Sequence, residues 1–147
     1  MKSTSMRMRD KIILRVVSRT FIPLVLLFGL YVQFHGDFGP GGGFQAGVIF
    51  AAGFVLYGLI FGLEQFNAVA PQRVVEIGLA VGLLLFGGVG VASILLHGNY
   101  LDYKVLNHHD PGHGLHNGIL LVELGVGITV TAAMMSIFYA FAGRGRE

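Results

Sequence analysis

The stretch Phe34-His35-Gly36-Asp37-Phe38-Gly39-Pro40-Gly41-Gly42-Gly43-Phe44 lies between two long apolar runs and contains five glycines and one proline. Glycine is used where the backbone must adopt positive φ or approach another group closely, and proline fixes φ and has no N–H to donate. This composition predicts a tight hairpin between two helices, with a structural loop motif formed by Pro40, Gly41, Gly42, Gly43 and Phe44. The side chains of His35 and Asp37 would lie beside the turn.

The composition of the 147-residue chain is that of a membrane protein forming one domain, residues 1–147. Hydrophobic residues make up 54% and charged residues only 12%, about half the charged share of an average soluble domain. The 23 glycines show no collagen repeat, and glycine is more frequent in transmembrane helices than in soluble ones. The absence of cysteine excludes disulfides and thiolate metal sites, and a net charge of +2 gives no indication of nucleic-acid binding.

Four apolar runs are long enough to span a bilayer as helices. About 20 apolar residues cross a hydrocarbon core of about 30 Å. We therefore expect an all-α integral membrane protein with spans near residues 12–34, 44–63, 77–96 and 119–141. Residues 64–73 are expected to form a short polar loop, and residues 97–118 the longest connection.

The basic residues predict the orientation. Four spans place both termini and the 64–73 loop on one side, and the opposite side holds only one basic residue, Lys104. The side of the termini holds the other nine of the ten Lys and Arg residues, namely Lys2, Arg7, Arg9, Lys11, Arg15, Arg19, Arg73, Arg144 and Arg146. Lys and Arg near span ends favour the cytoplasm, so both termini are expected to be cytoplasmic.

Small residues recur at helical spacing on the second and third spans. Gly43 and Gly47, Gly58 and Gly62, and Gly78 and Gly82 are small-xxx-small pairs, and Gly87 and Gly88 lie farther along the third span. Small faces let membrane helices approach closely and gain van der Waals contact. The pattern leaves two interpretations open: packing within the chain, or contact with other subunits.

No motif for nucleotide or metal binding is supported. Gly41-x-Gly43-x-x-Ala46 fits a dinucleotide fingerprint only loosely, because it lies between two spans and not after a strand. The residues His108, His109, Asp110, His113 and His116 form a cluster. Pro111, Gly112 and Gly114 are expected to break any helix that could put these side chains on one face. We therefore favour a solvated outer loop over a zinc site, and expect no metal and no cofactor.

The informative ionisable residue is Glu123, inside the last apolar run. An acid at such depth is costly and by default faces protein or water as part of an ion or proton route. His116, Glu123, Gly127 and Thr131 recur near one helical face, so His116 and Thr131 join Glu123, His35 and Asp37 as candidates for that route. A purely structural acid is the alternative. Glu76, at the start of the third span, is expected to be an interfacial anchor.

Two segments resemble a known family. They are Tyr31-x-x-Phe34-His35-Gly36-Asp37-Phe38-Gly39-Pro40-Gly41-Gly42-Gly43-Phe44-Gln45-Ala46-Gly47 and Val122-Glu123-Leu124-Gly125-Val126-Gly127. The first is similar to the signature of the MnhB (MrpB) component of the multisubunit Mrp sodium/proton antiporters, and the second to the last helix of that component. In the family, His-Asn-Ala is more usual where this chain has Asp37-Phe38-Gly39, and Asp is frequent at the position of Glu123.

The resemblance implies an accessory subunit of a large complex in the cytoplasmic membrane of a bacterium or archaeon. Its partners would be the other antiporter subunits and membrane lipids, and the exchanged ions sodium and protons. It would be a transporter subunit and not an enzyme. The same type of component is similar to modules of membrane-bound hydrogenases, so a redox-driven ion-translocating complex is the alternative. A purely structural scaffold is the third interpretation.

Overall fold

A computed structural model describes residues 11–36, 41–103 and 111–144, and for residues 111–114 it describes the backbone alone. The described elements are all helical: α1 (Ile12–Phe34), α2 (Gly43–Phe61), α3 (Leu63–Val69), α4 (Gln72–Leu95) and α5 (Pro111–Gly143). Four of them, all except α3, are long and apolar enough to cross a membrane. The expected all-α architecture with four transmembrane helices is therefore confirmed.

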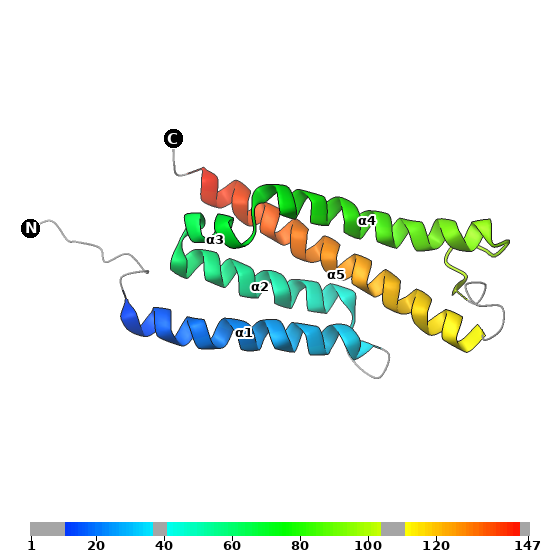
Figure 1. Cartoon of the computed structure of the whole chain (residues 1–147), viewed down its shortest axis with the longest axis horizontal. Helices are drawn as coiled ribbons and strands as arrows, with labels where there is room; N and C mark the ends of the chain where they lie inside the picture. Colours follow the sequence, from blue (N-terminus) through cyan, green and yellow to red (C-terminus); the bar gives the residue numbers. More distant parts are fainter. Residues whose placement is uncertain (1–10, 37–40, 104–110, 145–147) are drawn as a thin grey trace, which may run out of the picture.

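Helix α5 lies at the centre of the arrangement. It packs against both α2 and α4, whereas α1 packs mainly against α2. Figure 1 shows α5 running diagonally between α4 and the α1–α2 hairpin. At the end where α1 ends and α2 begins, α4 and α5 extend farther, so the end of α1 and the start of α2 are set back from the ends of the other two helices (Figure 1).

Glycines allow the close approaches between these helices. A Cβ on Gly47 would lie 2.8 Å from the carbonyl oxygen of Gly127, and one on Gly125 would lie 2.9 Å from the backbone nitrogen of Phe86. Real Cβ atoms essentially never come within 3.0 Å of another atom. The α2–α5 and α4–α5 contacts therefore depend on glycine, as is usual where membrane helices pack on small faces.

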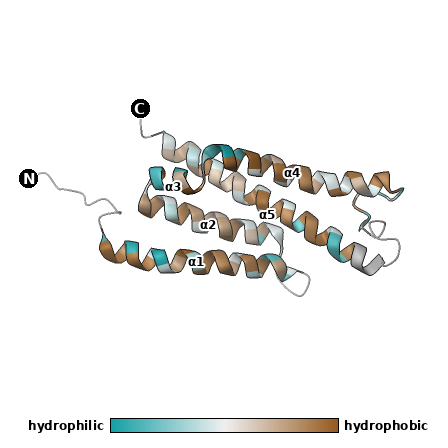
Figure 2. Cartoon of the chain, in the orientation of Figure 1, coloured by the Kyte–Doolittle hydropathy of each residue, from teal (hydrophilic) through white to brown (hydrophobic). Residues whose placement is uncertain are grey.

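Part of the glycine pattern remains uncovered. Of the described residues, none places an atom within 4 Å of a Cβ built on Gly87 or Gly88 of α4. Neighbouring apolar side chains on this helix are also open: Leu84 is 72% exposed and Leu95 75%. Figure 2 shows hydrophobic residues along all four long helices, with hydrophilic ones gathered around α3 and the start of α4. The outer face of α4 is thus available to lipid or to another subunit.

The segment between the second and third spans corrects an expectation. The sequence predicts a polar loop over residues 64–73, but α3 begins at Leu63, covers the first part of this segment and buries Phe66 completely. The ring of Phe66 meets that of Phe138 edge to face, with 5.0 Å between centroids. The hydroxyl of Tyr139 donates to the carbonyl oxygen of Ala70. Leu63 and Phe66 belong to the apolar cluster that packs α3 against α5. Gly62, with a φ of 96°, separates α2 from α3.

The bounds of α2, α4 and α5 also differ from the expected spans. Helix α1 has the expected bounds, but α2 ends at Phe61 and not at residue 63. Helix α4 begins at Gln72, five residues before the expected 77, and the side chain of Gln72 donates to Glu76 Oε1 at 3.0 Å. Helix α5 begins at Pro111, so the expectation that Pro111, Gly112 and Gly114 break a helix is wrong. Proline is well tolerated at the first helical position, where its missing N–H has no intrahelical partner.

Candidate ion-route site

The described part of the turn between α1 and α2 has a backbone hydrogen bond to α1 and glycines at positions where a Cβ would be strained or crowded. The N–H of Gly42 donates to the carbonyl oxygen of Val32 at 3.3 Å. Gly42 has φ 122° and ψ 178°, a conformation that side chains with a Cβ rarely adopt. A Cβ on Gly41 would lie 3.0 Å from the same Val32 oxygen. The predicted positions Asp37 and Pro40 lie outside the described residues.

The carboxylate of Glu123 is lodged against this turn. A Cβ on Gly36 would lie 2.8 Å from Glu123 Oε1 and 2.9 Å from Oε2, and one on Gly42 would lie 3.0 Å from Oε1. A Cβ on Gly43 would overlap the backbone carbonyl oxygen of Glu123. Gly36, Gly42 and Gly43 therefore border a recess that receives an acid from α5, far away in the sequence.

The electrostatics of the recess suit an anion. Helix α2 begins at Gly43, so the Glu123 carboxylate lies beside the N-terminus of α2. The first N–H groups of a helix have no intrahelical partner and, with the helix dipole, favour negative charge. Glu123 is half-buried and lines an open cleft of about 360 Å³ together with Gly41 to Gly43, Phe44, Gln45, Val122 and Val126.

A line of small and polar groups continues from Glu123 along α5. Gly127 faces Gln33 of α1, whose Oε1 would lie 2.6 Å from a Cβ at that position. One turn further, the hydroxyl of Thr131 lies 2.7 Å from the carbonyl oxygen of Gly127 and 3.1 Å from that of Gly47. The structure thus brings Glu123, Gly127 and Thr131 together against the α1–α2 hairpin. His116 lies on the exposed surface of α5, nearer to its start.

The other predicted residues lie around this site. His35 directly follows α1 as its C-terminal cap, is exposed, and stacks on Tyr31 with 4.8 Å between ring centroids. Phe44, in the first turn of α2, is 61% exposed and borders the cleft. Glu76 lies away from the cleft, on the exposed surface near the opposite end of the bundle, with Gln72 as its hydrogen-bond donor.

The histidine cluster falls largely outside the description. His108, His109 and Asp110 lie outside the described residues, and so does the side chain of His113. Among the residues that the structure does describe, no group of three or more His, Asp or Glu side chains could hold a metal ion.

Sequence reasoning missed one residue, Gln33. It is 4% exposed, and its Nε2 has no hydrogen-bond partner within the described structure. A buried donor without a partner is rare and costly. The sequence does single out Gln33, because it is the only amide side chain among residues 20–34. Its polarity alone does not show whether the side chain points toward other helices or away from them.

The fold and this site together define a class: a multi-pass α-helical membrane protein whose first hairpin receives an acid from its last helix. The pattern of a family described as "Domain related to MnhB subunit of Na+/H+ antiporter" matches residues 13–136, and the chain belongs to this family. It is similar to a Staphylococcus haemolyticus protein assigned as antiporter subunit mnhB2, with 31% identity over 91% of this chain and 96% of the relative. A Staphylococcus aureus (strain MRSA252) protein with the same assignment is 28% identical over the same shares.

Proposed function

We propose that this chain acts as an accessory subunit of a multisubunit sodium/proton antiporter, packing against antiporter subunits and shaping part of an ion route. Membership of the MnhB family supports the complex. The uncovered outer face of α4, with Gly87, Gly88, Leu84 and Leu95, supports contact with further subunits.

The observation that carries the ion-route proposal is the position of Glu123. Its carboxylate reaches an open cleft at the set-back end of the α1–α2 hairpin, beside the positive end of α2. A negative charge in such a recess attracts a cation or accepts a proton, while the glycines keep the recess open. Ionisable groups within membrane-spanning helices commonly mark such routes.

The rest of the route belongs to other subunits in this proposal. Between residues 115 and 143, Glu123 is the only carboxylate of the last helix. A multi-step relay across a membrane needs several ionisable groups in sequence. This chain therefore contributes a single step at one end, and sodium and protons are the ions we propose for it.

We also propose a location and an orientation. The membrane is the cytoplasmic membrane of a bacterium or archaeon, and both termini lie in the cytoplasm. The start of α1 and the end of α5 lie at the same end of the bundle (Figure 1). Arg15, Arg19, Arg73 and Arg144 belong to that end, which agrees with the preference of basic residues for the cytoplasmic side. The Glu123 recess then opens outward.

Substitution of Glu123 tests the ion route. Glu123→Gln keeps the shape and removes the charge, so sodium-dependent proton exchange in membrane vesicles is expected to fall while the complex still assembles. Glu123→Asp is expected to retain part of the activity. The matched control is Glu76→Gln, which makes the same chemical change at an exposed acid outside the cleft.

Two outcomes would decide against the route. If an assembled Glu123→Gln complex transports as well as the unmodified one, Glu123 is structural and the chain is a scaffold. If Glu76→Gln lowers transport as much as Glu123→Gln, the loss reflects charge in general and not the recess. Complex size on a native gel has to accompany both measurements, because a variant that fails to assemble would lose transport for another reason.

A further inference from the structure

Three basic residues lie in line at the start of α1. Lys11, Arg15 and Arg19 are spaced four residues apart, so they share one side of the helix, and all three are exposed. Ser18 and Ile22 continue this side and are buried, and α2 is the main helix that packs against α1. The basic residues therefore lie on the side of α1 that faces α2.

Helix α2 ends too early to cover them. With 23 residues α1 is about 34 Å long, and with 19 residues α2 is about 28 Å long. The two helices meet at the hairpin, where the N–H of Gly42 donates to the carbonyl oxygen of Val32, so the difference of about 6 Å falls at the start of α1. Figure 1 shows this start projecting beyond the end of α2. The result is a step, here called the α1–α2 step, bordered by the three basic residues and by Phe61.

Arg19 is held at the corner of this step. Its guanidinium carbon lies 5.8 Å from the centroid of the Phe61 ring, which is a cation–π contact with the last residue of α2. The ring of Phe61 packs in turn against that of Tyr57, with 4.8 Å between centroids. Side chains on a helix lean toward its N-terminus, so Arg19 reaches toward the end of the span and not into its middle. The guanidinium group is thus positioned at the level where α2 ends.

No described residue neutralises the positive charge of the step. None of its three basic side chains forms an ion pair within the described part of the chain. The ten residues before them add more positive than negative charge, with Lys2, Arg7, Arg9 and Asp10. Like charges one turn apart on a helix repel each other, and an anion between them removes this repulsion. The step therefore favours an anion supplied from outside the chain.

We propose that the α1–α2 step binds the headgroup of an anionic glycerophospholipid, whose phosphate accepts hydrogen bonds from Arg15 and Arg19. Helix α2, at about 28 Å, matches a hydrocarbon core of about 30 Å, so the extra turn of α1 lies in the headgroup layer, which is about 5–8 Å thick on each side. Lipid phosphates are the anions concentrated in that layer. A guanidinium group binds a phosphate through two parallel N–H donors, and basic clusters at the end of a span attract anionic lipids.

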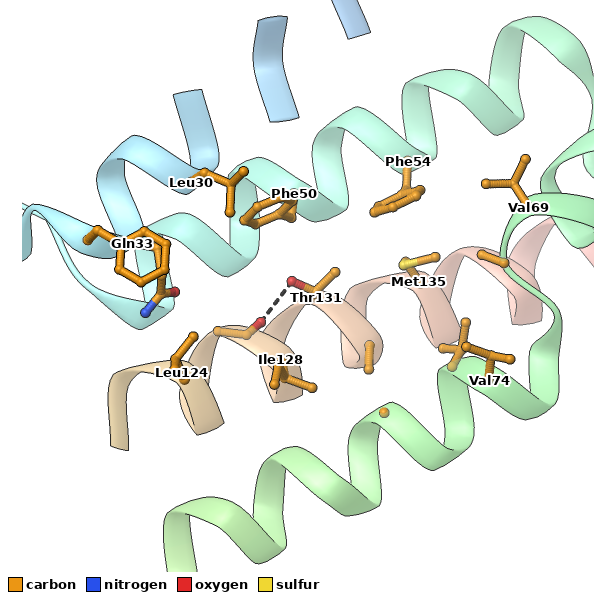
Figure 3. Close-up of a pocket in the computed structure, with 16 residues that line it drawn as sticks. Leu30, Gln33, Phe50, Phe54, Val69, Val74, Leu124, Ile128, Thr131 and Met135 are labelled. Atoms are coloured by element: carbon orange, nitrogen blue, oxygen red, sulfur yellow. Dashed lines mark hydrogen bonds between the residues drawn. The ribbon is translucent and has the colours of Figure 1, made fainter. Parts of the chain in front are cut away.

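The step is separate from two other hollows. The Glu123 cleft lies at the opposite end of the α1–α2 pair. An apolar groove of about 400 Å³ lies between this pair and the α4–α5 pair, with Gln33, Phe50 and Met135 among its lining residues (Figure 3). Binding at the step is therefore independent of the proposed ion route.

A matched control separates a bound headgroup from a general attraction of basic residues to the membrane. Arg144 is exposed at the same end of the bundle (Figure 1), and its guanidinium carbon lies 5.7 Å from the centroid of the Phe141 ring. It is outside the step. Diffuse attraction depends on the number of charges near the surface, so it predicts equal effects for Arg19→Gln and Arg144→Gln. A headgroup held in the step predicts an effect for Arg19→Gln alone.

The test uses the complex purified through a tag on this chain and placed in nanodiscs of equal parts phosphatidylglycerol and phosphatidylcholine. The probe is one or the other lipid with a photoreactive diazirine near the ester of one acyl chain, and adducts are located by mass spectrometry. We expect the phosphatidylglycerol probe to label residues 11–21 and 57–63 at least about tenfold more than the phosphatidylcholine probe. Arg19→Gln should lower this preference about fivefold, and Arg144→Gln should leave it unchanged.

Two further variants keep the test decisive if Arg19→Gln does not assemble. Arg15 has no side-chain hydrogen bond, ion pair or ring contact with a described residue, so Arg15→Gln is expected to assemble and to lower the preference about fivefold. Phe61→Leu keeps every charge but removes the ring that positions Arg19, and should lower the preference about twofold.

Three results would overturn the proposal. Equal labelling of the step by the two probes, or equal losses in Arg19→Gln and Arg144→Gln, would show that the attraction is diffuse. Lipid adducts on residues 141–144 but none on the step would show that a protein segment covers it in the complex. Displacement of the phosphatidylglycerol probe by inorganic phosphate, beyond that caused by sodium chloride at the same ionic strength, would identify a soluble anion as the occupant.

Discussion

Substitution of Gly43 by alanine tests the contact on which the recess depends. Gly43 begins α2 and faces the backbone of α5. An alanine Cβ there would overlap the carbonyl oxygen of Glu123 and lie 2.8 Å from its carbonyl carbon. Backbone atoms cannot turn aside as a flexible side chain can, so α2 has to move away from α5.

The magnitude follows from two opposing terms. Overpacking a close contact costs about 1–3 kcal/mol. Replacing glycine by alanine in a helix gains up to about 1 kcal/mol, and less at a first helical position. The net expectation is a loss of about 1–2 kcal/mol. For a chain of this size, each kcal/mol lowers the midpoint of thermal unfolding by roughly 2–4 °C.

The assay is the temperature at which the detergent-solubilised chain, carrying a fluorescent tag, loses half of its folded size-exclusion peak. Gly43→Ala should lower this temperature by about 2–8 °C. The control Gly87→Ala should keep or slightly raise it, since a Cβ at Gly87 meets open space. Equal midpoints for the two variants would refute the close approach of α2 and α5 at the loop.

Three further predictions concern the loop, the α3 contact and the topology. Gly42→Val places a β-branched residue at a φ of 122°, so assembly on a native gel should fail before expression does; an intact complex would show the loop to be an ordinary linker. Tyr139→Phe removes the hydrogen bond to Ala70 and should cost about 1 kcal/mol in thermal stability, whereas an unchanged midpoint would show that this bond does not hold α3 in place. Because the chain has no native cysteine, Asp37→Cys and Asn107→Cys should react with an impermeant thiol reagent outside intact cells, while Ser3→Cys and Arg146→Cys should not. Labelling of the termini from outside would reverse the orientation.

The fold was largely predictable from the sequence, because the length of an apolar run is set directly by the thickness of a bilayer. Helix α1 has the predicted bounds, and the family assignment from the glycine-rich loop is confirmed by the match over residues 13–136. The errors lie at the ends of spans. Helix α5 begins eight residues early because Pro111 can start a helix, and α3 forms because Phe66 has a buried position to occupy.

The candidate site was predictable only in part. Helical spacing placed Gly127 and Thr131 on the side of Glu123, and the structure brings the three to the same hairpin. Spacing within one helix could not say that Gly36 and Gly42 would receive the carboxylate, because that contact joins distant parts of the chain. The burial of Gln33 and the groove beside it also arise from packing between helices, so neither has a local signature.

Identification of everything that co-purifies with this chain tests the central claim most directly. The chain carries a tag at its C-terminus, the membrane is solubilised in a gentle detergent, and the retained proteins are identified by mass spectrometry. The account predicts long antiporter-like membrane subunits in constant proportion to the tagged chain. Recovery of the chain alone, or with nickel–iron or iron–sulfur subunits, would contradict its place in a sodium/proton antiporter.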